Sequence, residues 1–495
     1  MKVLFAASEC VPFIKTGGLA DVVGSLPVEL VRKGVDARVI LPKYILIDSA
    51  YRNSMEHVCD FEVLFGQEKK YCGIDRYEHK GVVFYFIDNE ELFSCEQIYG
   101  DGLAEGARFA FFCRAILEAL PRIDFIPDIL HLNDWQTGLA AALLKKQYQW
   151  DKKMRPVRTV FSIHNLKYQG IFPWQDMNYL LGFDDDMFTP DCLEFYGSMS
   201  CMKAGIVFSD HVSTVSESYA NEIRTGYFGE RLDGLLRYKG DAVSGILNGI
   251  DKETFNPAAD EYIAALYEPQ NMDGKIVCKR ELQKEMGLAQ EPDTPVISII
   301  SRMTSQKGFD LIERVLEDIM RQKLQMVFLG SGEKRYVDLA NWAAGRYPGR
   351  VGTYIGMNEP LAHRIYAGSD MFLMPSQFEP CGLSQMISLR YGTVPIVRET
   401  GGLRDSIIPY NKYTDEGTGF SFINYNAHEM LYTIERAVRY YRNDKEMWKR
   451  MVARGMAEDF GWNVSAQKYI ALYESLLKST KKTGSSRKTT KKSGT

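Results

Sequence analysis

The feature that most constrains the fold is a repeated alternation between short apolar runs and longer segments with helical spacing. The chain opens with the apolar run 2–8, passes through a loop with adjacent glycines, and continues into 19–32, where apolar residues recur with the period of a helix. Strands that alternate with helices need crossover connections, which favours a mainly parallel sheet covered by helices. The same pattern predicts strands at 36–41, 126–132 and 157–163 and helices at 108–120 and 135–147.

A second alternation follows a turn at Asn248-Gly249 and a polar stretch that ends at Pro257. Because 495 residues exceed one ordinary hydrophobic core, we expect two doubly wound α/β domains facing across a cleft lined by strand C-terminal ends. The second alternation predicts strands at 296–300, 326–330, 352–355, 371–375 and 394–397, with helices beginning at 309, 359 and 383. The expected parts are domains 1–247 and 248–460, a last helix over 461–478 and a disordered basic tail over 479–495.

Composition argues against several classes of function. The formal net charge of −4 gives no general attraction to the nucleic-acid backbone, so nucleic acid is not an expected partner. No apolar run reaches the roughly 18 residues of a membrane span and no secretory leader is evident, so we expect a soluble, cytoplasmic protein. The nine cysteines form no C-x-x-C pair and the seven histidines no H-x-x-x-H pair, so we expect reduced thiols and no metal site.

Two cationic loops follow the first expected strand of each domain. Lys15, with Gly17 and Gly18, lies between strand and helix, where backbone N–H groups and the helix dipole favour an anion. Arg302 and Lys307 share one short loop, and a guanidinium and an ammonium there can neutralise a departing diphosphate without a bound metal. Taken alone, each pattern is more typical of an ordinary turn or of solvated surface cations.

Two further candidates also follow expected strands. Glu379 lies near the start of a helix, where it could hold a sugar hydroxyl or stabilise an oxocarbenium-like carbon, or could simply be a favourable charge at the helix terminus. The nearby Thr400-Gly401-Gly402 is expected to add free amides. His164 lies just past a strand, at the expected cleft edge.

Two further segments resemble motifs of other enzyme classes, but neither has the structural context that its motif requires. Gly330-Ser331-Gly332 follows a strand, but Arg335 occupies the place of the third glycine of a dinucleotide fingerprint, so nicotinamide binding is not supported. Residues 184–186 are three consecutive aspartates that match a D-x-D metal motif, yet no strand precedes them. We interpret this second motif as a solvated loop.

The candidate segments, in this order and at these separations, closely resemble the bacterial glycogen synthase and plant starch synthase family. The resemblance extends from Val3 to about Leu477 and includes 134–138 (DWQTG), 247–251 (LNGID) and 391–393 (YGT). It implies the GT-B fold of two Rossmann-like domains, with the last helix returning to the N-terminal domain. It also implies cofactor-free transfer of glucose, with retention of configuration, from ADP-glucose to the non-reducing 4-hydroxyl end of an α-1,4-glucan such as glycogen.

The resemblance also implies roles for individual residues. The acceptor hydroxyl is expected to attack from the front face while the departing phosphate takes its proton. Relatives often carry an aromatic residue at the position of Met357, where a flexible thioether here would cover the nucleobase, so UDP-glucose stays open as the donor. The implied catalytic residues are Glu379, His164, Arg302 and Lys307. The implied donor site comprises Lys15, Gly17, Gly18, Arg302, Lys307, Cys381, Gly382, Leu383, Thr400 and Gly401. Asp21 and Asn248 are expected to shape the glucose and acceptor region.

Three other readings of the sequence remain. The nearest is another GT-B transferase, or a phosphorylase that uses pyridoxal phosphate on the same scaffold. A two-Rossmann oxidoreductase would need the missing glycine fingerprint. A non-catalytic glucan-binding protein would leave Arg302, Lys307 and Glu379 without a chemical role.

Overall fold

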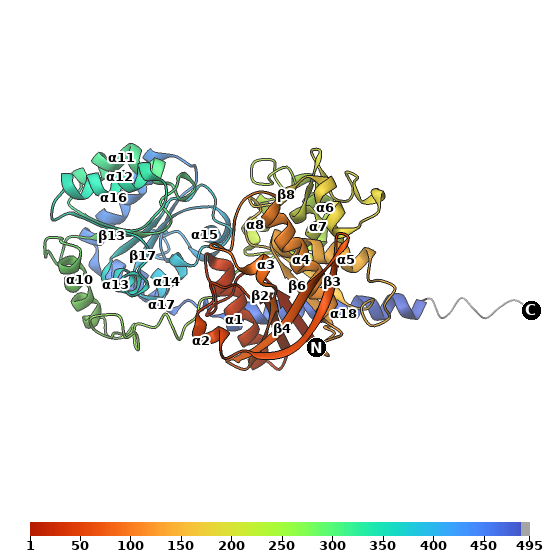
Figure 1. The fold of residues 1–495 in the computed structure, drawn as a ribbon. Coiled ribbons are helices and arrows are strands. Elements are labelled where there is room, and N and C mark those ends of the chain that lie inside the picture. The colour runs from red at the N-terminus through yellow and green to blue at the C-terminus, as the bar shows by residue number, and fades with distance from the viewer. Residues whose placement is uncertain (487–495) are drawn as a thin grey trace, which may run out of the picture. The chain divides into compact units, whose positions relative to one another are not determined.

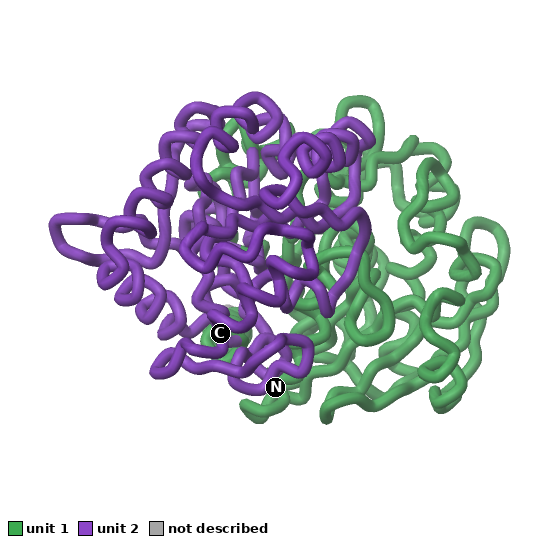
Figure 2. The backbone as a smooth tube through the Cα atoms, turned by 90° about the vertical axis from the view of Figure 1, so that its left-hand side faces the viewer, with its two compact units in different colours: residues 1–215, 220–246, 462–495 green, residues 216–219, 247–461 purple. Residues whose placement is uncertain are grey.

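Two largely parallel sheets organise the chain, each in its own compact unit. A computed structural model describes residues 1–486. Unit 1 comprises 1–215, 220–246 and the segment that begins at 462, and unit 2 comprises 216–219 and 247–461 (Figure 2). Within the described residues the larger sheet has nine strands and belongs to unit 1, while the second has six and belongs to unit 2. The expected class of two Rossmann-like α/β domains is confirmed.

The sheet of unit 1 has the order β12-β11-β7-β6-β1-β2-β5-β4-β3, and its first seven members run parallel. Residues 3–6 of β1 are all fully buried, as expected for a strand covered by helices on both faces. Strand order reverses between β1 and β6, where open α/β sheets bind ligands. The strands are β1 (Lys2–Ala6), β2 (Asp36–Pro42), β3 (Glu56–Phe65), β4 (Glu68–His79), β5 (Val82–Asp88), β6 (Ile129–Asn133), β7 (Arg158–Ile163), β11 (His211–Thr214) and β12 (Val243–Gly245).

Helices cover this sheet, and a small antiparallel sheet, β8-β10-β9, is added after β7. Sequence periodicity predicted neither the small sheet nor the antiparallel pair β3–β4, because both are built from short or strongly polar strands. The small sheet comprises β8 (Ile171–Phe172), β9 (Glu194–Phe195) and β10 (Ser198–Ser200). The helices of unit 1 are α1 (Gly18–Arg32), α2 (Ser49–Arg52), α3 (Glu90–Phe93), α4 (Leu103–Ala119), α5 (Trp135–Lys146), α6 (Trp174–Leu181), η1 (Asp185–Met187), α7 (Cys201–Phe208), α9 (Asp233–Lys239), η2 (Gly240–Ala242) and α18 (Trp462–Ser486). The short helix α8 (Glu217–Glu222) is divided between the two units.

The last helix, α18, belongs to unit 1, where it packs against α1 (Figure 1). A buried polar chain fastens it to the sheet: the Tyr473 hydroxyl lies 2.6 Å from Nδ1 of His131, whose Nε2 lies 2.6 Å from Oγ of Ser162. Ser162 Oγ is in turn 2.5 Å from that of Ser213. The helix continues past its predicted end at residue 478, and 487–495, the rest of the predicted tail, lie outside the described residues.

The sheet of unit 2 is parallel throughout, with the order β15-β14-β13-β16-β17-β18. Its order reverses between β13 and β16. The strands are β13 (Val296–Ile300), β14 (Gln325–Gly330), β15 (Val351–Ile355), β16 (Met371–Met374), β17 (Val394–Arg398) and β18 (Phe420–Phe422). The helices are α10 (Asp273–Glu285), η3 (Ser305–Lys307), α11 (Phe309–Arg321), α12 (Lys334–Arg346), α13 (Glu359–Gly368), α14 (Ser384–Arg390), α15 (Gly401–Ser406), α16 (Ala427–Asn443) and α17 (Lys445–Ala457).

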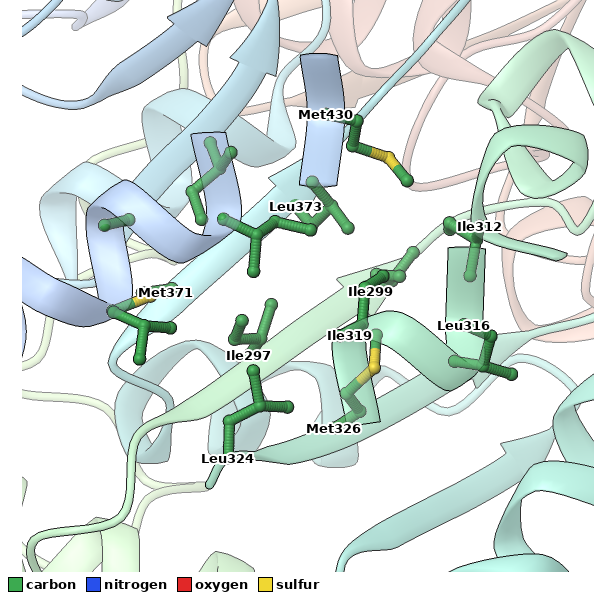
Figure 3. Close-up of a cluster of buried hydrophobic side chains, with 14 of the residues drawn as sticks. Ile297, Ile299, Ile312, Leu316, Ile319, Leu324, Met326, Met371, Leu373 and Met430 are labelled. Atoms are coloured by element: carbon green, nitrogen blue, oxygen red, sulfur yellow. The ribbon is translucent and has the colours of Figure 1, made fainter. Parts of the chain in front are cut away.

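The main core of unit 2 lies on one face of this sheet (Figure 3). Ile297 and Ile299 of β13 point into it, and α11 contributes a stripe at helical spacing. A second cluster, which includes Val296 of β13, occupies the other face. Burial on both faces fixes where β13 and β16 end, and hence where their loops begin. None of the described helices combines the length and apolar character that a membrane span requires.

The buried histidine beneath α18 should make unit 1 sensitive to acid. Burial lowers the pKa of His131 from its ordinary 6.5 to about 3. Its stabilising contribution is therefore complete above pH 6.5 and is lost as the pH falls toward 3, because only the unfolded chain then takes up the proton. Between pH 6.5 and pH 5 this amounts to up to about 2 kcal/mol.

We expect His131→Gln, which cannot take up that proton, to lose less stability than the wild type when urea unfolding is compared at pH 7 and pH 5. His428→Gln, which alters an exposed histidine, serves as the control and should lose as much stability between pH 7 and pH 5 as the wild type. If the wild type and His131→Gln lost the same free energy of unfolding between pH 7 and pH 5, buried His131 would not be the source of the acid sensitivity.

Candidate functional site

Two loops meet where the strand order of unit 2 reverses. One follows β13 and the other follows β16, its parallel neighbour, so both leave the same edge of the sheet. Gln377 donates its amide hydrogen to the Gln306 carbonyl at 2.8 Å. Gly308 has φ +80°, and a β-carbon there would lie 2.3 Å from the carbonyl oxygen of Pro375. Glycine at 308 therefore lets the two loops pack backbone to backbone.

This packing brings together two of the predicted catalytic side chains. Lys307 Nζ lies 2.6 Å from Oε2 of Glu379, and the hydroxyl of Ser376 donates to the same oxygen at 3.0 Å. The side chains of the pair are 17% and 9% exposed, so solvent screens the interaction only partly. The ammonium group of Lys307 is thereby held in place before any ligand arrives.

The loop after β13 owes its course to the Gly330-Ser331-Gly332 segment. A β-carbon at Gly330 would lie 1.9 Å from the carbonyl oxygen of Ser301, and one at Gly332 would lie 2.4 Å from that of Met303. The two glycines thus admit the neighbouring backbone. Arg302 projects from this loop with an exposed side chain that makes no ion pair with any described residue.

The loop after β17 packs directly on the segment that carries Glu379. A β-carbon at Gly401, where φ is +46°, would lie 2.0 Å from the Glu379 carbonyl oxygen. The Gly402 amide donates to that same oxygen at 3.1 Å, so the amide that was expected to be free is already engaged. Thr400 is fully buried.

The remaining candidates of unit 2 lie beside this segment. Asn248 is buried against Cys381, and burial raises the pKa of the Cys381 thiol to about 12, which keeps it protonated at neutral pH. Gly382 has φ +71°, which favours glycine, and Leu383 is the N-cap of α14. Unit 2 thus gathers all of its predicted site residues around the ends of β13, β16 and β17.

In unit 1 the glycine loop after β1 is held by a buried carboxylate that no sequence motif indicated. Glu9, only 3% exposed, accepts hydrogen bonds from the amides of Thr16 and Gly17 and from the Thr16 hydroxyl. The Gly17 amide is therefore not free, contrary to the expectation for this loop. Lys15 forms a salt bridge of 2.7 Å with Asp21 in the first turn of α1, and Gly18, which begins α1, is exposed.

His164 lies at the end of β7, beside the end of β6. Its Nε2 is 3.0 Å from Oδ1 of Asn133, while the Asn133 amide nitrogen donates to two backbone carbonyls. Because the Asn133 amide nitrogen donates to those carbonyls, the amide oxygen must be the atom that faces His164. An oxygen can only accept, so Nε2 of His164 carries the hydrogen and Nδ1 remains an acceptor. Burial lowers the pKa of His164 to about 4, and the ring is neutral at pH 7.

Asp134 is a second carboxylate, partly buried, that was not among the residues selected from the sequence. It accepts the His164 amide hydrogen at 2.7 Å, and burial, which outweighs this bond, raises its pKa to about 7. Its φ of +56° at the N-cap of α5 is uncommon for aspartate. Its position directly after β6, next to the reversal of strand order, is the signal that could have identified it.

The structure places the predicted residues in two separate groups. Unit 1 carries Lys15, Gly17, Gly18, Asp21 and His164. Unit 2 carries Asn248, Arg302, Lys307, Glu379, Cys381, Gly382, Leu383, Thr400 and Gly401. Among the described residues no group of three or more His, Cys, Asp or Glu side chains is arranged to hold a metal ion.

Both units match known protein families. Residues 2–238 match the family model for the starch synthase catalytic domain, and 282–455 match that for glycosyl transferases group 1. The chain is 52% identical to a glycogen synthase of Geobacillus thermodenitrificans over 478 residues, 97% of this chain and 98% of the relative. It is also 52% identical over 477 residues to a glycogen synthase of Desulforamulus reducens, covering 96% and 99%.

Solved structures agree with these matches. The catalytic domain of starch synthase IV from Arabidopsis thaliana, bound to ADP and acarbose, is similar with a TM-score of 0.88 and 33% identity, covering 96% of this chain and 99% of that one. Sucrose-phosphate synthase from Thermosynechococcus elongatus has a TM-score of 0.60 at 14% identity, covering 97% and 99%. This second likeness concerns the fold alone.

We expect Gly401→Ala to destabilise unit 2 by at least about 1–2 kcal/mol, because alanine is strained at this positive φ and would collide with the Glu379 carbonyl. Gly345→Ala is the matched control: Gly345 is exposed in α12, nothing surrounds it within 4 Å, and alanine there should be neutral or stabilising. Thermal unfolding of both variants measures the difference. Equal midpoints would contradict the close packing at Gly401.

Proposed function

The chain belongs to the glycogen and starch synthase family of glycosyltransferases, and on that premise we propose that it transfers glucose, with retention of configuration, from ADP-glucose to the non-reducing 4-hydroxyl end of an α-1,4-glucan such as glycogen. The observation that carries the proposal is the Lys307–Glu379 pair at the reversal point of the unit 2 sheet. There a fixed ammonium lies where α/β sheets bind nucleotides.

In this proposal the cations of unit 2 stabilise the departing diphosphate. Arg302 has an exposed guanidinium, whose fork of N–H donors suits phosphate oxygens. Lys307 supplies a point charge that Glu379 and its loop have already oriented, so little reorganisation accompanies the reaction. Backbone groups of 381–383 and of Thr400 and Gly401 are assigned to the hydroxyls and phosphate of the donor.

Unit 1 supplies a second set of groups. We assign Lys15, with the glycines at 17 and 18, to the diphosphate, and its salt bridge with Asp21 must open or adjust for this contact. Neutral His164 would accept a hydrogen bond from a glucose hydroxyl at Nδ1, since Nε2 donates to Asn133. Asp21 and Asn248 are assigned to the glucose and acceptor region.

The proposed chemistry needs no protein nucleophile. One carboxylate oxygen of Glu379 is held by both Lys307 and Ser376, which suits it to orient the sugar and to stabilise positive charge at the anomeric carbon. The acceptor hydroxyl attacks from the face that the diphosphate leaves, and the departing phosphate takes the hydroxyl proton. Configuration is retained because attack and departure share one face.

The proposal also specifies which nucleobase the sugar donor carries. Met357, 87% exposed, follows β15, and its flexible thioether would cover a base without selecting between adenine and uracil. We favour ADP-glucose because the similar starch synthase IV structure holds ADP. UDP-glucose is the alternative, and parallel assays with both donors distinguish them.

We place this reaction in the cytoplasm, with the nucleotide sugar and the glucan as its partners and without a cofactor. Incubation with radiolabelled ADP-glucose and glycogen tests the activity directly, because a glucan synthase moves label into the polymer. A phosphorylase would instead use glucose 1-phosphate and show the absorbance of bound pyridoxal phosphate.

We expect Lys307→Ala and Glu379→Ala each to lower turnover by about 10²-fold or more, since removing one preorganised charge typically costs that much. Lys284→Ala, which alters a lysine of α10 that is 68% exposed, is the control and should keep normal turnover. Circular dichroism checks that the variants fold. Near-normal turnover in either active-site variant would refute the role given to that residue.

We also expect turnover to persist in excess chelator, because side-chain cations stabilise the leaving group in this mechanism. The assay compares initial rates with and without EDTA after dialysis against it. Loss of activity that added Mg²⁺ restores would contradict the cation-based mechanism.

A further inference from the structure

The backbone carbonyls that lie two residues before Lys307 and Glu379 both accept hydrogen bonds from side chains outside their own loops. Ser305 supplies the first carbonyl, in the loop after β13, and Gln377 supplies the second, in the loop after β16. The donors lie at or just after the ends of β17 and β18 (β13, β17 and α16 are labelled in Figure 1). The two loops are therefore held from a third segment, in addition to the bond that joins them at Gln306.

Arg398, the half-buried last residue of β17, holds the loop after β16. Its Nη1 donates to the Gln377 carbonyl at 2.5 Å, and its Nε donates to the Ile423 carbonyl at 3.1 Å. The guanidinium carbon lies 5.8 Å from the centre of the Tyr425 ring. Because a guanidinium presents its N–H donors in one rigid plane, these contacts fix the two carbonyls relative to each other.

Tyr425 holds the loop after β13. Its hydroxyl donates to the Ser305 carbonyl at 2.8 Å and also lies within hydrogen-bond distance of the Asp310 carboxylate in the first turn of α11. Burial and, next, the bond to Asp310 raise the pKa of Tyr425, so the hydroxyl keeps its hydrogen at neutral pH. Since Ser305 and Asp310 lie on either side of Lys307 in the chain, one phenol spans the turn that carries the ammonium group.

The connection between β18 and α16 presents Tyr425 from a fixed backbone. Asn424 donates from its backbone and side-chain nitrogens to the Glu429 carboxylate at 3.0 and 2.6 Å. Asn426 caps α16 and accepts from the amides of His428 and Glu429 at 2.9 and 3.1 Å. Tyr425 lies between these two asparagines, so both of its chain neighbours are held by the start of the helix.

We propose that Tyr425 and Arg398 are positioning residues for glucose transfer, an inference that rests on the function proposed above. They hold the loops after β13 and β16 so that Lys307 and Glu379 keep the separation that stabilises the departing diphosphate. Neither side chain is assigned a contact with substrate. The effect on rate comes from the loops, because a displacement of about 1 Å in a reacting group can cost about 10²-fold.

Tyr425→Phe removes the hydroxyl and leaves the ring beside Arg398. We expect kcat to fall about 3- to 10-fold, as for loss of one hydrogen bond, while the KM for glycogen changes by less than about twofold. Tyr432→Phe, at a tyrosine of α16 that is 60% exposed, is the matched control and should keep the wild-type kcat. A normal kcat in Tyr425→Phe, from a wild type that transfers glucose, would overturn the proposal.

Arg398→Lys and Arg398→Gln separate geometry from charge. Lysine keeps the charge but lacks the rigid plane that serves two carbonyls at once, so we expect both variants to lose kcat by a similar factor. Full activity in Arg398→Lys together with a loss in Arg398→Gln would show that charge alone counts and would overturn the role given to Arg398.

A double-mutant cycle separates positioning from general loss of structure. In the Lys307→Ala background, Tyr425→Phe should cost less than about twofold in kcat, because no ammonium group is left to position. A lower fraction of folded protein would instead reduce kcat by the same factor in both backgrounds. An equal loss in both backgrounds would therefore overturn the proposal.

Hydrogen exchange examines the loops without any assay of transfer. The Gln377 amide, which donates to the Gln306 carbonyl, should exchange at least about 3-fold faster in Tyr425→Phe and at the wild-type rate in Tyr432→Phe. Unchanged exchange at Gln377 in Tyr425→Phe would overturn the proposal whether or not the protein transfers glucose. If exchange is faster but the wild type uses neither donor, the proposed function fails and the hold on the loops stands.

Discussion

The salt bridge between Lys307 and Glu379 is the interaction on which the proposed chemistry of unit 2 depends. It forms only because β13 and β16 are parallel neighbours whose loops leave one edge of the sheet, and because Gly308 and Gly401 admit a neighbouring backbone. Removing one member of a partly buried pair leaves the other without compensation, at a typical cost of about 3–5 kcal/mol for fully buried pairs. The core beneath the sheet, with isoleucines on β13 and a matching stripe on α11, keeps both strand ends in register.

The two units use different electrostatics at their sheet edges. Unit 2 presents cations, one exposed at Arg302 and one oriented at Lys307. Unit 1 places a buried carboxylate, Glu9, against the glycine loop and a partly buried one, Asp134, against the His164 backbone, and burial raises the pKa of each. Both carboxylates accept hydrogen bonds from backbone amides of the neighbouring loops, and these bonds hold the loops in place. The neutral His164 ring, with its tautomer set by Asn133, is a consequence of the same buried surroundings.

The alternation of apolar runs and helical spacing predicted both parallel sheets, because fully buried strands leave a strong signal. Strand-end logic placed Lys307 and Glu379 in loops that follow predicted strands, but it did not predict the contact between their side chains. Glu9 escaped notice because an isolated acidic residue in a loop carries no pattern until the fold buries it. Asp134 was noted only as part of the 134–138 segment, although its position just after a predicted strand could have singled it out. The prediction of free amides at Gly17 and Gly402 was wrong, because tertiary contacts that the sequence does not reveal supply their hydrogen-bond partners.

The central claim is that Lys307 and Glu379 act as one unit in stabilising the transition state. A double-mutant cycle on kcat for glucose transfer from ADP-glucose to glycogen tests it most directly. If the pair is a unit, the double variant Lys307→Ala/Glu379→Ala will be about as slow as the slower single variant, because the second substitution removes nothing that still functions. Rate losses that multiply in the double variant would show two independent contributions and contradict this account.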